Sequence, residues 1–400
     1  MPASLSTFLR LVMAAGDREP MADVLVNVFL RGGADGLNLV PPHGEKAYYA
    51  ERPSLALAQP NAQPNERSDD ETSGVVNLDG FFGLHPGLRP LQPLYEQKQL
   101  AVVHAVGSHD QTRSHFEAQD LMERGSPVDQ NLGSGWLARH LRTRAGDRSP
   151  LSAVAISDVL PESLRGSPGA SAVRNVEAFS IDLKDEDRAG FEKGLQTLYG
   201  REDGELGRAG LQVLETLGTV DRLRREANQT DEAGDYPDGQ FGDALRQVAR
   251  LIKAEVGLEV ACVDIGGWDS HFVQAGGFGG LASDLGQGLA AFAAELRPFW
   301  NRVTVVTMSE FGRRLHENVS LGTDHGRGGV MFVLGGNVRG GRVIADWPGL
   351  AKDDLEGPGD LRVTTDYRDI LGEIVARRLQ NEQVAKVFPG HTLREYGIVS

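Results

Sequence analysis

Several apolar runs in this chain end directly in polar, glycine-rich turns, and this pattern strongly limits the folds that it can adopt. The run VLVNVFL (24–30) leads into RGGADGLN, LEVACVDI (258–265) leads into GGWDSHF, and VTVVTMS (303–309) leads into EFGRR. Short apolar runs of this kind are typical of strands that are buried on both faces of a parallel sheet. In open sheets of this class, ligands bind beyond the carboxyl ends of the strands. The sequence therefore predicts a functional site along one edge of a mainly parallel sheet.

Strands and helices are expected to alternate along most of the chain. Further predicted strands are LAVVHAVG (100–107), SAVAIS (152–157) and GVMFVLG (329–335). Helices are predicted from near Arg113 to Gly125 and over 208–228, 239–257, 281–299 and 366–379. The helix over 281–299 follows a Gly-rich loop. This alternation predicts an α/β fold in which helices cover both faces of a central, mainly parallel sheet.

Polar stretches suggest how the chain is divided. Residues 1–23 are expected to form an N-terminal helical segment, and residues 24–400 a single α/β domain. The range 59–74 is rich in Pro, Asn and charge, which predicts an exposed loop. The range 158–236 shows little strand character and is interpreted as a possible helical insertion or cap.

The charge balance narrows the classes of partner. The chain has 41 Lys and Arg against 56 Asp and Glu, a formal net charge of −15. Nucleic-acid binding needs concentrated positive charge, so no such partner is expected. A small anionic substrate is compatible with this negative net charge, because a bound metal can make the local electrostatic potential positive. No apolar run predicts a membrane span, and without a visible export signal we expect a cytoplasmic protein, export of a processed form being the alternative.

Carboxylate and imidazole side chains gather beside the predicted strands. Such side chains are the usual protein ligands of Zn, Mn or Fe. Each has an ordinary alternative: Asp35 suits a turn aspartate that bonds its own backbone, and Glu310 suits a helix cap with Ser309. Together they predict a site for one or two divalent metal ions, with candidate ligands Asp35, Asp264, Asp269, His271, Glu310 and His325.

A second set of candidates would act on the substrate. Thr112 and Ser114 lie where a helix is expected to begin, so each is either a nucleophile activated by a metal or an N-cap. His115 follows them and is a candidate metal ligand, acid/base group or oxyanion donor. Arg313 suits the binding of an anionic group, the alternative being a solvent-facing arginine.

The order of these motifs resembles the bacterial family catalogued as domain of unknown function 1501. The resemblance runs from about Val24 to the FPG at 388–390. It implies membership of the alkaline-phosphatase and sulfatase-like metalloenzymes, with an alkaline-phosphatase-like central sheet and usually one or two divalent metals. The matching positions would be Asp35, Thr112 or Ser114, Asp264, Asp269, His271, Glu310 and His325. The resemblance rests on VFLRGGADGLNLVPP (28–42), YYAERPSLAL (48–57), LDGFFGLHPGLRPL (78–91), LAVVHAVG (100–107), RSHFEAQDLMERG (113–125), DIGGWDSHF (264–272), TMSEFGRRLHENVSLGTDHGRGG (307–329) and TTDYRDILGEI (364–374).

Two departures from that superfamily shape the functional hypothesis. Glu310-Phe311 stands where alkaline phosphatases usually have an Asp-His pair, so one His ligand is missing and His115 is the candidate to replace it. The sulfatase signature, a Cys or Ser followed by Pro and Arg, is absent, which argues against a formylglycine sulfatase.

We therefore expect a metal-dependent hydrolase of a phosphate or sulfate ester. Ser114, Thr112 or a metal-bound water would attack, while His115 and Arg313 would stabilise the anionic transition state. The alternatives are a non-catalytic binding or scaffold protein that has lost a full metal site, and a phosphoryl-transferring mutase of the same fold.

Overall fold

The computed structural model describes most of the chain from residue 22 onwards. The described residues are 22–60, 74–126, 132–144, 149, 151–167, 169–175, 185–202, isolated positions between 204 and 218, and 234–400. Most of the expected N-terminal segment (1–23), loop (59–74) and helix (208–228) lies outside these residues.

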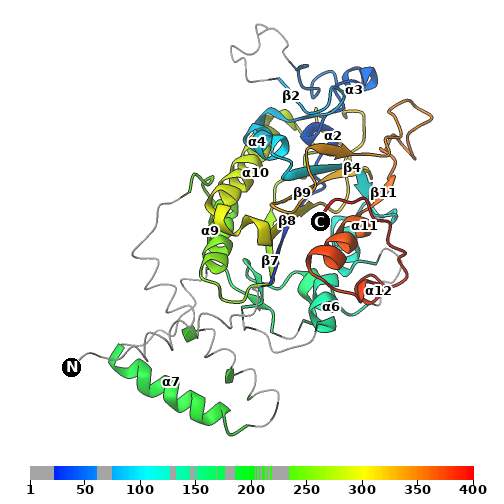
Figure 1. Cartoon of the computed structure of the whole chain (residues 1–400). Coiled ribbons are helices and arrows are strands. Elements are labelled where there is room, and N and C mark those ends of the chain that lie inside the picture. The colour runs from blue at the N-terminus through cyan, green and yellow to red at the C-terminus, as the bar shows by residue number, and fades with distance from the viewer. Residues whose placement is uncertain are drawn as a thin grey trace.

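A large, mostly parallel sheet forms the centre of the molecule (Figure 1). In the described residues its order is β10-β4-β9-β8-β1-β7-β5-β6, and β11 pairs with β4. Every pairing is parallel except those that β9 makes with β4 and β8. The predicted mainly parallel sheet is thus confirmed. Its strands are β1 (Val24–Leu30), β4 (Leu100–Gly107), β5 (Ala153–Ala155), β6 (Ser171–Ala172), β7 (Val260–Ile265), β8 (Val303–Met308), β9 (Gly329–Gly335), β10 (Arg342–Ile344) and β11 (Thr365–Asp366).

The apolar runs are long because the inner strands are covered on both faces. All of β1 is buried, with Val26 and Val28 in the hydrophobic core on one face and Leu25 and Phe29 in the core on the other. Successive side chains of a strand point to opposite faces, so a strand in the middle of such a sheet needs apolar residues at every position. The run VLVNVFL meets this requirement apart from Asn27.

Helices pack against both faces, with α9 and α10 on one side and α6 and α11 on the other (Figure 1). The expected helix 281–299 begins earlier, at Ala275, and ends at Glu295. The glycines in it favour close packing: a Cβ at Gly286 would lie 2.5 Å from the carbonyl oxygen of Gly87. The helices on the two faces are η1 (Pro86–Leu91), α4 (Gln92–Glu96), α9 (Gln240–Lys253), α10 (Ala275–Glu295), α6 (Trp136–Thr143), α11 (Tyr367–Glu373), the π-helical turn η4 (Ile374–Arg378) and α12 (Val384–Val387).

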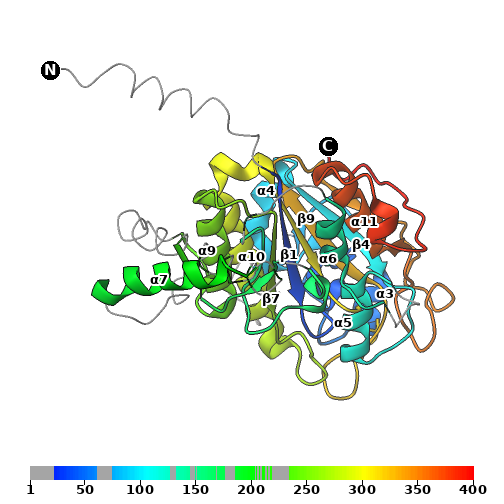
Figure 2. The same cartoon turned by 90° about the horizontal axis from the view of Figure 1, so that it is seen from below.

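The remaining elements are short or lie outside these layers. The range 158–236 supplies β6 at the sheet edge and α7, which stands apart from the sheet beyond α9 in both views (Figures 1 and 2). Its role as a cap stays a prediction. In the part of the chain that is described, no helix has the length and apolar character to cross a bilayer. The other elements are α2 (Gly36–Leu39), α3 (Lys46–Glu51), β2 (Val76–Asn77), β3 (Gly83–Leu84), α5 (His115–Arg124), η2 (Glu162–Leu164), α7 (Asp185–Tyr199) and η3 (Arg297–Arg302).

Candidate metal centre

The topology brings distant segments to one edge of the sheet. β1, β7 and β8 are parallel neighbours, so the loops that follow them leave from the same edge. β4 shares their direction because both it and β8 pair antiparallel with β9, and α5 follows β4. The loop that precedes β9 therefore ends at this edge too. Figure 2 shows α5 at the lower end of the sheet, the end to which β1 runs.

His115, the first residue of α5, is oriented by Glu310. Its Nδ1 lies 2.7 Å from Oε1 of Glu310. A carboxylate accepts, so Nδ1 donates and the neutral ring has its lone pair on Nε2. That atom is buried, makes no hydrogen bond, and lies 3.4 Å from Oδ2 of Asp269. The imidazole therefore presents a free ligand atom to Asp269.

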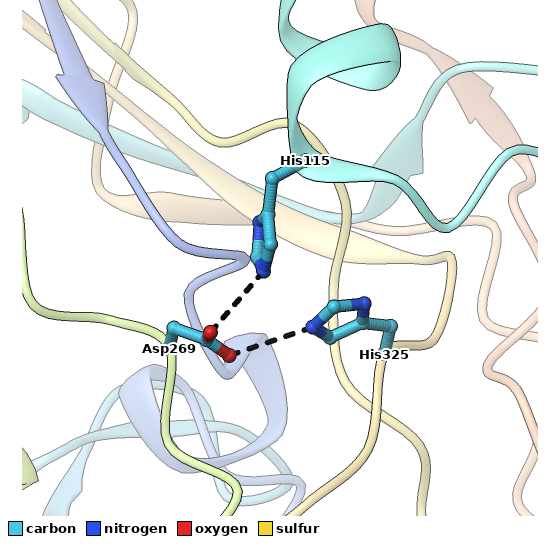
Figure 3. A group of neighbouring side chains, drawn as sticks. All are labelled: His115, Asp269 and His325. Atoms are coloured by element: carbon cyan, nitrogen blue, oxygen red, sulfur yellow. Dashed lines mark hydrogen bonds and ion pairs between the residues drawn. The ribbon is translucent and has the colours of Figure 1, made fainter.

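His325 is oriented in the same way by a main-chain carbonyl. Its Nδ1 donates to the carbonyl oxygen of Arg113 at 2.8 Å, and this leaves Nε2 as the acceptor of the neutral ring. Nε2 lies 3.4 Å from Oδ1 of Asp269. Figure 3 shows Asp269 between the imidazoles of His115 and His325, which come from separate segments. The ligand atoms of these three residues all lie within 4.8 Å of one another.

His271 adds a third imidazole to the same carboxylate. Its Nδ1 lies 3.2 Å from Oδ1 of Asp324, so the lone pair is again on Nε2. Nε2 lies 3.2 Å from Oδ1 of Asp269 and only 2.9 Å from Nε2 of His325. Two neutral rings that donate from Nδ1 cannot hydrogen-bond through Nε2, because both atoms are acceptors. A proton or a metal ion between them removes this conflict.

Asp269 is fixed by Arg313, whose predicted role in binding substrate does not match its position. Arg313 is fully buried and donates to Oδ1 of Asp269 at 2.8 Å. Its other bonds go to the carbonyl oxygens of Gly32, Gly33, Thr323 and Trp268. With its donors used inside the protein, Arg313 supports a ligand rather than facing a substrate. Asp269 is itself half exposed, which leaves the cluster open to small molecules.

Local interactions favour the metal-binding forms of these groups. Burial opposes ionisation of Asp269, but the hydrogen bond and charge of Arg313 outweigh it and lower the pKa of the carboxyl. Burial lowers the pKa of His325, against the opposing hydrogen bond to Arg113. The hydrogen bond from Asn318 is the largest contribution that lowers the pKa of Asp324. Ionised carboxylates and neutral imidazoles are the forms that bind metals.

Glu310 binds Nδ1 of His115, the ring nitrogen that does not face Asp269. It is buried, and Oε1 accepts from the main-chain N–H of Gly32 at 2.9 Å and from the side chain of Gln119 at 2.9 Å, besides His115. The second oxygen accepts from Ser309. The structure thus brings Glu310 to the cluster as the partner of a ligand, the position that often fixes the tautomer in metal sites.

Asp35 and Asp264 have their carboxylates engaged elsewhere. Asp35 is fully buried, pairs with Arg52 at 2.6 Å and accepts from Gln274 at 2.6 Å. Asp264 lies within β7 and pairs with Arg31 at 3.1 Å. The structure does not place either carboxylate among the convergent donors around Asp269.

The two candidate nucleophiles differ in their surroundings. The Thr112 hydroxyl donates to Glu117 at 3.0 Å and accepts from the N–H of Ser114. Ser114 is exposed and occupies the N-cap position of α5, but its side chain does not cap the helix. Of the two hydroxyls, that of Ser114 is therefore the less engaged.

Supporting residues were harder to recognise in the sequence. Asp324 orients His271, and the ring of Phe311 packs 5.0 Å from His115 and 4.7 Å from His325 between ring centroids. Gln119 is four residues after His115, the spacing at which helical side chains share a face. This spacing is the sequence pattern that indicates its bond to Glu310, the partner of His115. The carbonyl of Arg113 carries no side-chain signal.

The chain belongs to a family of uncharacterised proteins. The family described as "Protein of unknown function (DUF1501)" matches residues 22–382, which is most of the chain. This match confirms the family resemblance drawn from the sequence motifs. No curated protein matches the chain.

Proposed function

We propose that this member of the family of unknown function is a metal-dependent hydrolase of a phosphate or sulfate ester. One divalent ion would be held by Asp269 and by Nε2 of His115, His271 and His325. The observation that carries the proposal is the convergence of these three Nε2 atoms on one carboxylate, while each Nδ1 is bound to an acceptor. Such outer partners are the usual companions of metal-binding histidines.

The spacing of the donor atoms fits an ion. Metal–nitrogen and metal–oxygen bonds of roughly 2.0–2.1 Å in a tetrahedral site place the donors about 3.3 Å apart. The imidazole-to-carboxylate distances are 3.4 Å from His115 to Oδ2 of Asp269, and 3.2 Å and 3.4 Å from His271 and His325 to Oδ1. Three nitrogen donors and one oxygen suit Zn, Mn or Fe.

The charge of such a centre suits an anionic ester. Three neutral imidazoles and one carboxylate leave a divalent ion with net positive charge. When bound, the ion supplies a Lewis acid for the ester and lowers the pKa of a coordinated water to about 7. Ser114 directly precedes His115 at the start of α5, where free N–H groups favour anions. We assign the attack to the Ser114 hydroxyl, with water as the alternative.

The fold is consistent with this assignment. A mainly parallel sheet with its donors at the carboxyl edge supports our inference that the domain is alkaline-phosphatase-like. A phosphoryl-transferring mutase would use the same centre, and transfer to an added alcohol without phosphate release would distinguish it. A scaffold protein that has lost its metal would bind no ion.

The first test is the metal content of protein purified without a His tag, for the wild type and His325→Ala. The matched control is His43→Ala, since His43 bonds Asn77 outside the cluster. We expect about one ion per chain in the wild type and the control, and a loss in His325→Ala. Phosphate and sulfate esters should be turned over only by the loaded proteins. Wild-type protein that stays without metal after reconstitution would refute the proposal.

A further inference from the structure

Several exposed apolar side chains lie in the segments that carry or contact the proposed metal ligands. Phe116 and Phe272 leave 86% and 76% of their surface exposed. They directly follow His115 and His271 in the chain. Large exposed apolar groups that gather in one place often mark a binding surface. We call this set the apolar rim; its members are Phe116, Phe272, Val273, Val319 and Leu321.

Most of the rim belongs to two loops that are bound to each other. The N–H groups of Val273 and Gln274 donate to the carbonyl oxygens of Ser320 and Leu321, each at 2.9 Å. Asn318 donates to the carbonyl of His271 at 3.0 Å. The loops could not lie so close with a side chain at position 322, because a Cβ at Gly322 would lie 2.3 Å from the carbonyl carbon of His271. The rim is therefore connected to a metal ligand by fixed backbone contacts.

The backbone of the rim is strained where glycine would relieve it. Val273 has φ of 44° and Leu321 has φ of 59°, both in the left-handed region. This region is especially unfavourable for a β-branched residue such as valine. Glycine at either place would remove both the strain and the exposed apolar surface. Since neither stability nor solubility favours Val and Leu here, their side chains point to a function.

The position of the rim identifies what covers it. Oδ2 of Asp269 faces His115, which Phe116 follows, whereas Oδ1 faces His271, which Phe272 follows. Phe116 and Phe272 are thus each next to a residue that faces Asp269, so a molecule that contacts both of them lies beside the metal centre. A protein partner or a lipid surface in this position would close the centre to a substrate, so the substrate is the occupant that fits.

We propose that the substrate is an amphiphilic ester, whose anionic group lies at the metal centre and whose alkyl or aryl group lies on the apolar rim. This inference rests on the proposed function, because it assigns the substrate class of the same site. It predicts that an apolar group near the ester raises kcat/KM through burial against Phe116 and Phe272.

The test compares matched esters, octyl and ethyl phosphate and octyl and ethyl sulfate, below the concentration at which the octyl compounds form micelles. We expect wild-type kcat/KM to be at least about tenfold higher for the octyl ester. In Phe116→Ser and in Phe272→Ser this ratio should fall towards one. Val159→Ser is the matched control, since Val159 is an exposed valine outside the rim. It should leave the ratio unchanged.

A binding measurement keeps the test informative if turnover is slow. Calorimetry with octylphosphonate and methylphosphonate should show the same preference in metal-loaded protein, and its loss in both Phe variants. Equal binding of the two phosphonates, binding of neither, or an unchanged ratio in the variants would overturn the inference. So would Phe272-dependent binding to phosphatidylcholine vesicles without any ester preference. Metal content and ethyl-ester turnover report on the proposed function separately, so the two failures can be told apart.

Discussion

Nε2 of His271 and Nε2 of His325 lie 2.9 Å apart, although both rings donate from Nδ1 to an acceptor. Two lone pairs at this distance repel each other unless a cation is shared between them. Asp324 and the carbonyl of Arg113 accept the Nδ1 protons and so leave both lone pairs on Nε2. They hold both rings with their ligand atoms aimed at one point, which is the geometry that a metal ion requires.

Replacement of Asp324 should therefore weaken metal binding without removing a ligand. In Asp324→Asn, the acceptor for Nδ1 of His271 loses its charge. The new amide also faces Arg314, which in the wild-type protein donates to Asp324 at 3.2 Å. We expect metal affinity to fall roughly 10- to 100-fold. Competition with a chelator of known affinity measures this change. Asp353→Asn, at an exposed position, is the control, and equal affinity in the two variants would contradict the role of Asp324.

Asp35 should contribute to stability rather than to metal binding. Its carboxylate and Arg52 form a fully buried ion pair, with Nη1 to Oδ2 at 2.6 Å. Arg52→Met would leave the carboxylate buried without its partner, a change that costs about 3–5 kcal/mol. Urea denaturation should show this loss, and Asp35→Asn should also be destabilised.

The matched measurement for these two variants is metal content. We expect Arg52→Met and Asp35→Asn to keep their ion under conditions in which they are folded. A folded Asp35→Asn protein that loses its metal would instead return Asp35 to the ligand set that the sequence motifs suggested.

Local sequence patterns were enough to predict the sheet and the edge at which the donors meet. Buried strands need unbroken apolar runs, and parallel strands bring the turns that follow them together. The turn GGWDSHF and the loop before β9 therefore placed Asp269, His271 and His325 correctly at one edge. His115, proposed as a metal ligand, an acid/base group or an oxyanion donor, comes to the same carboxylate because β4 shares the direction of β8.

The rest depended on partners that no local pattern shows. Asp35 meets Arg52, the residue after α3, and Asp264 on β7 meets Arg31, the residue after β1. Glu310 looks like a ligand in the sequence, but its oxygens are used by His115, Gly32, Gln119 and Ser309. Long-range hydrogen bonds of this kind decide which carboxylate is free to face an ion. The sequence shows only which segments carry the carboxylates.

His104 should make the protein less stable in acid. It is fully buried on β4, where Nε2 donates to the carbonyl of Val40 at 2.9 Å and Nδ1 accepts from the N–H of Ala105 at 2.8 Å. Burial lowers its pKa from 6.5 to about 4, against smaller opposing effects of Val40 and Asp35. Above pH 6.5 neither the folded nor the unfolded chain is charged at this residue, so it adds no pH dependence there.

As the pH falls from 6.5 towards 4, the unfolded chain takes up a proton that the folded chain does not. The folded state should therefore lose roughly 3 kcal/mol of stability over this range through His104. Urea denaturation at several pH values measures the slope. His104→Gln should be less stable at pH 7 but should show a flatter dependence between pH 6.5 and 4. An unchanged slope would contradict the prediction. His85, whose pKa burial also lowers to about 4, contributes in the same direction in both proteins.

The exposed hydroxyl of Ser114 gives the sharpest test of how an ester would be attacked. Ser114 precedes the ligand His115 and makes no side-chain cap to α5, whereas the hydroxyl of Thr112 is bonded to Glu117. If Ser114 is the nucleophile, Ser114→Ala should lower kcat at least about 100-fold, because the covalent route is lost while the metal stays bound. Thr112→Ala should lower kcat far less.

The metal content of both variants must match the wild type for the comparison to hold, since His115 follows Ser114 directly in the chain. Brief reaction with a labelled phosphate ester and an acid quench should leave label on the wild-type chain and none on Ser114→Ala. Full activity in Ser114→Ala would exclude this residue and assign the attack to water.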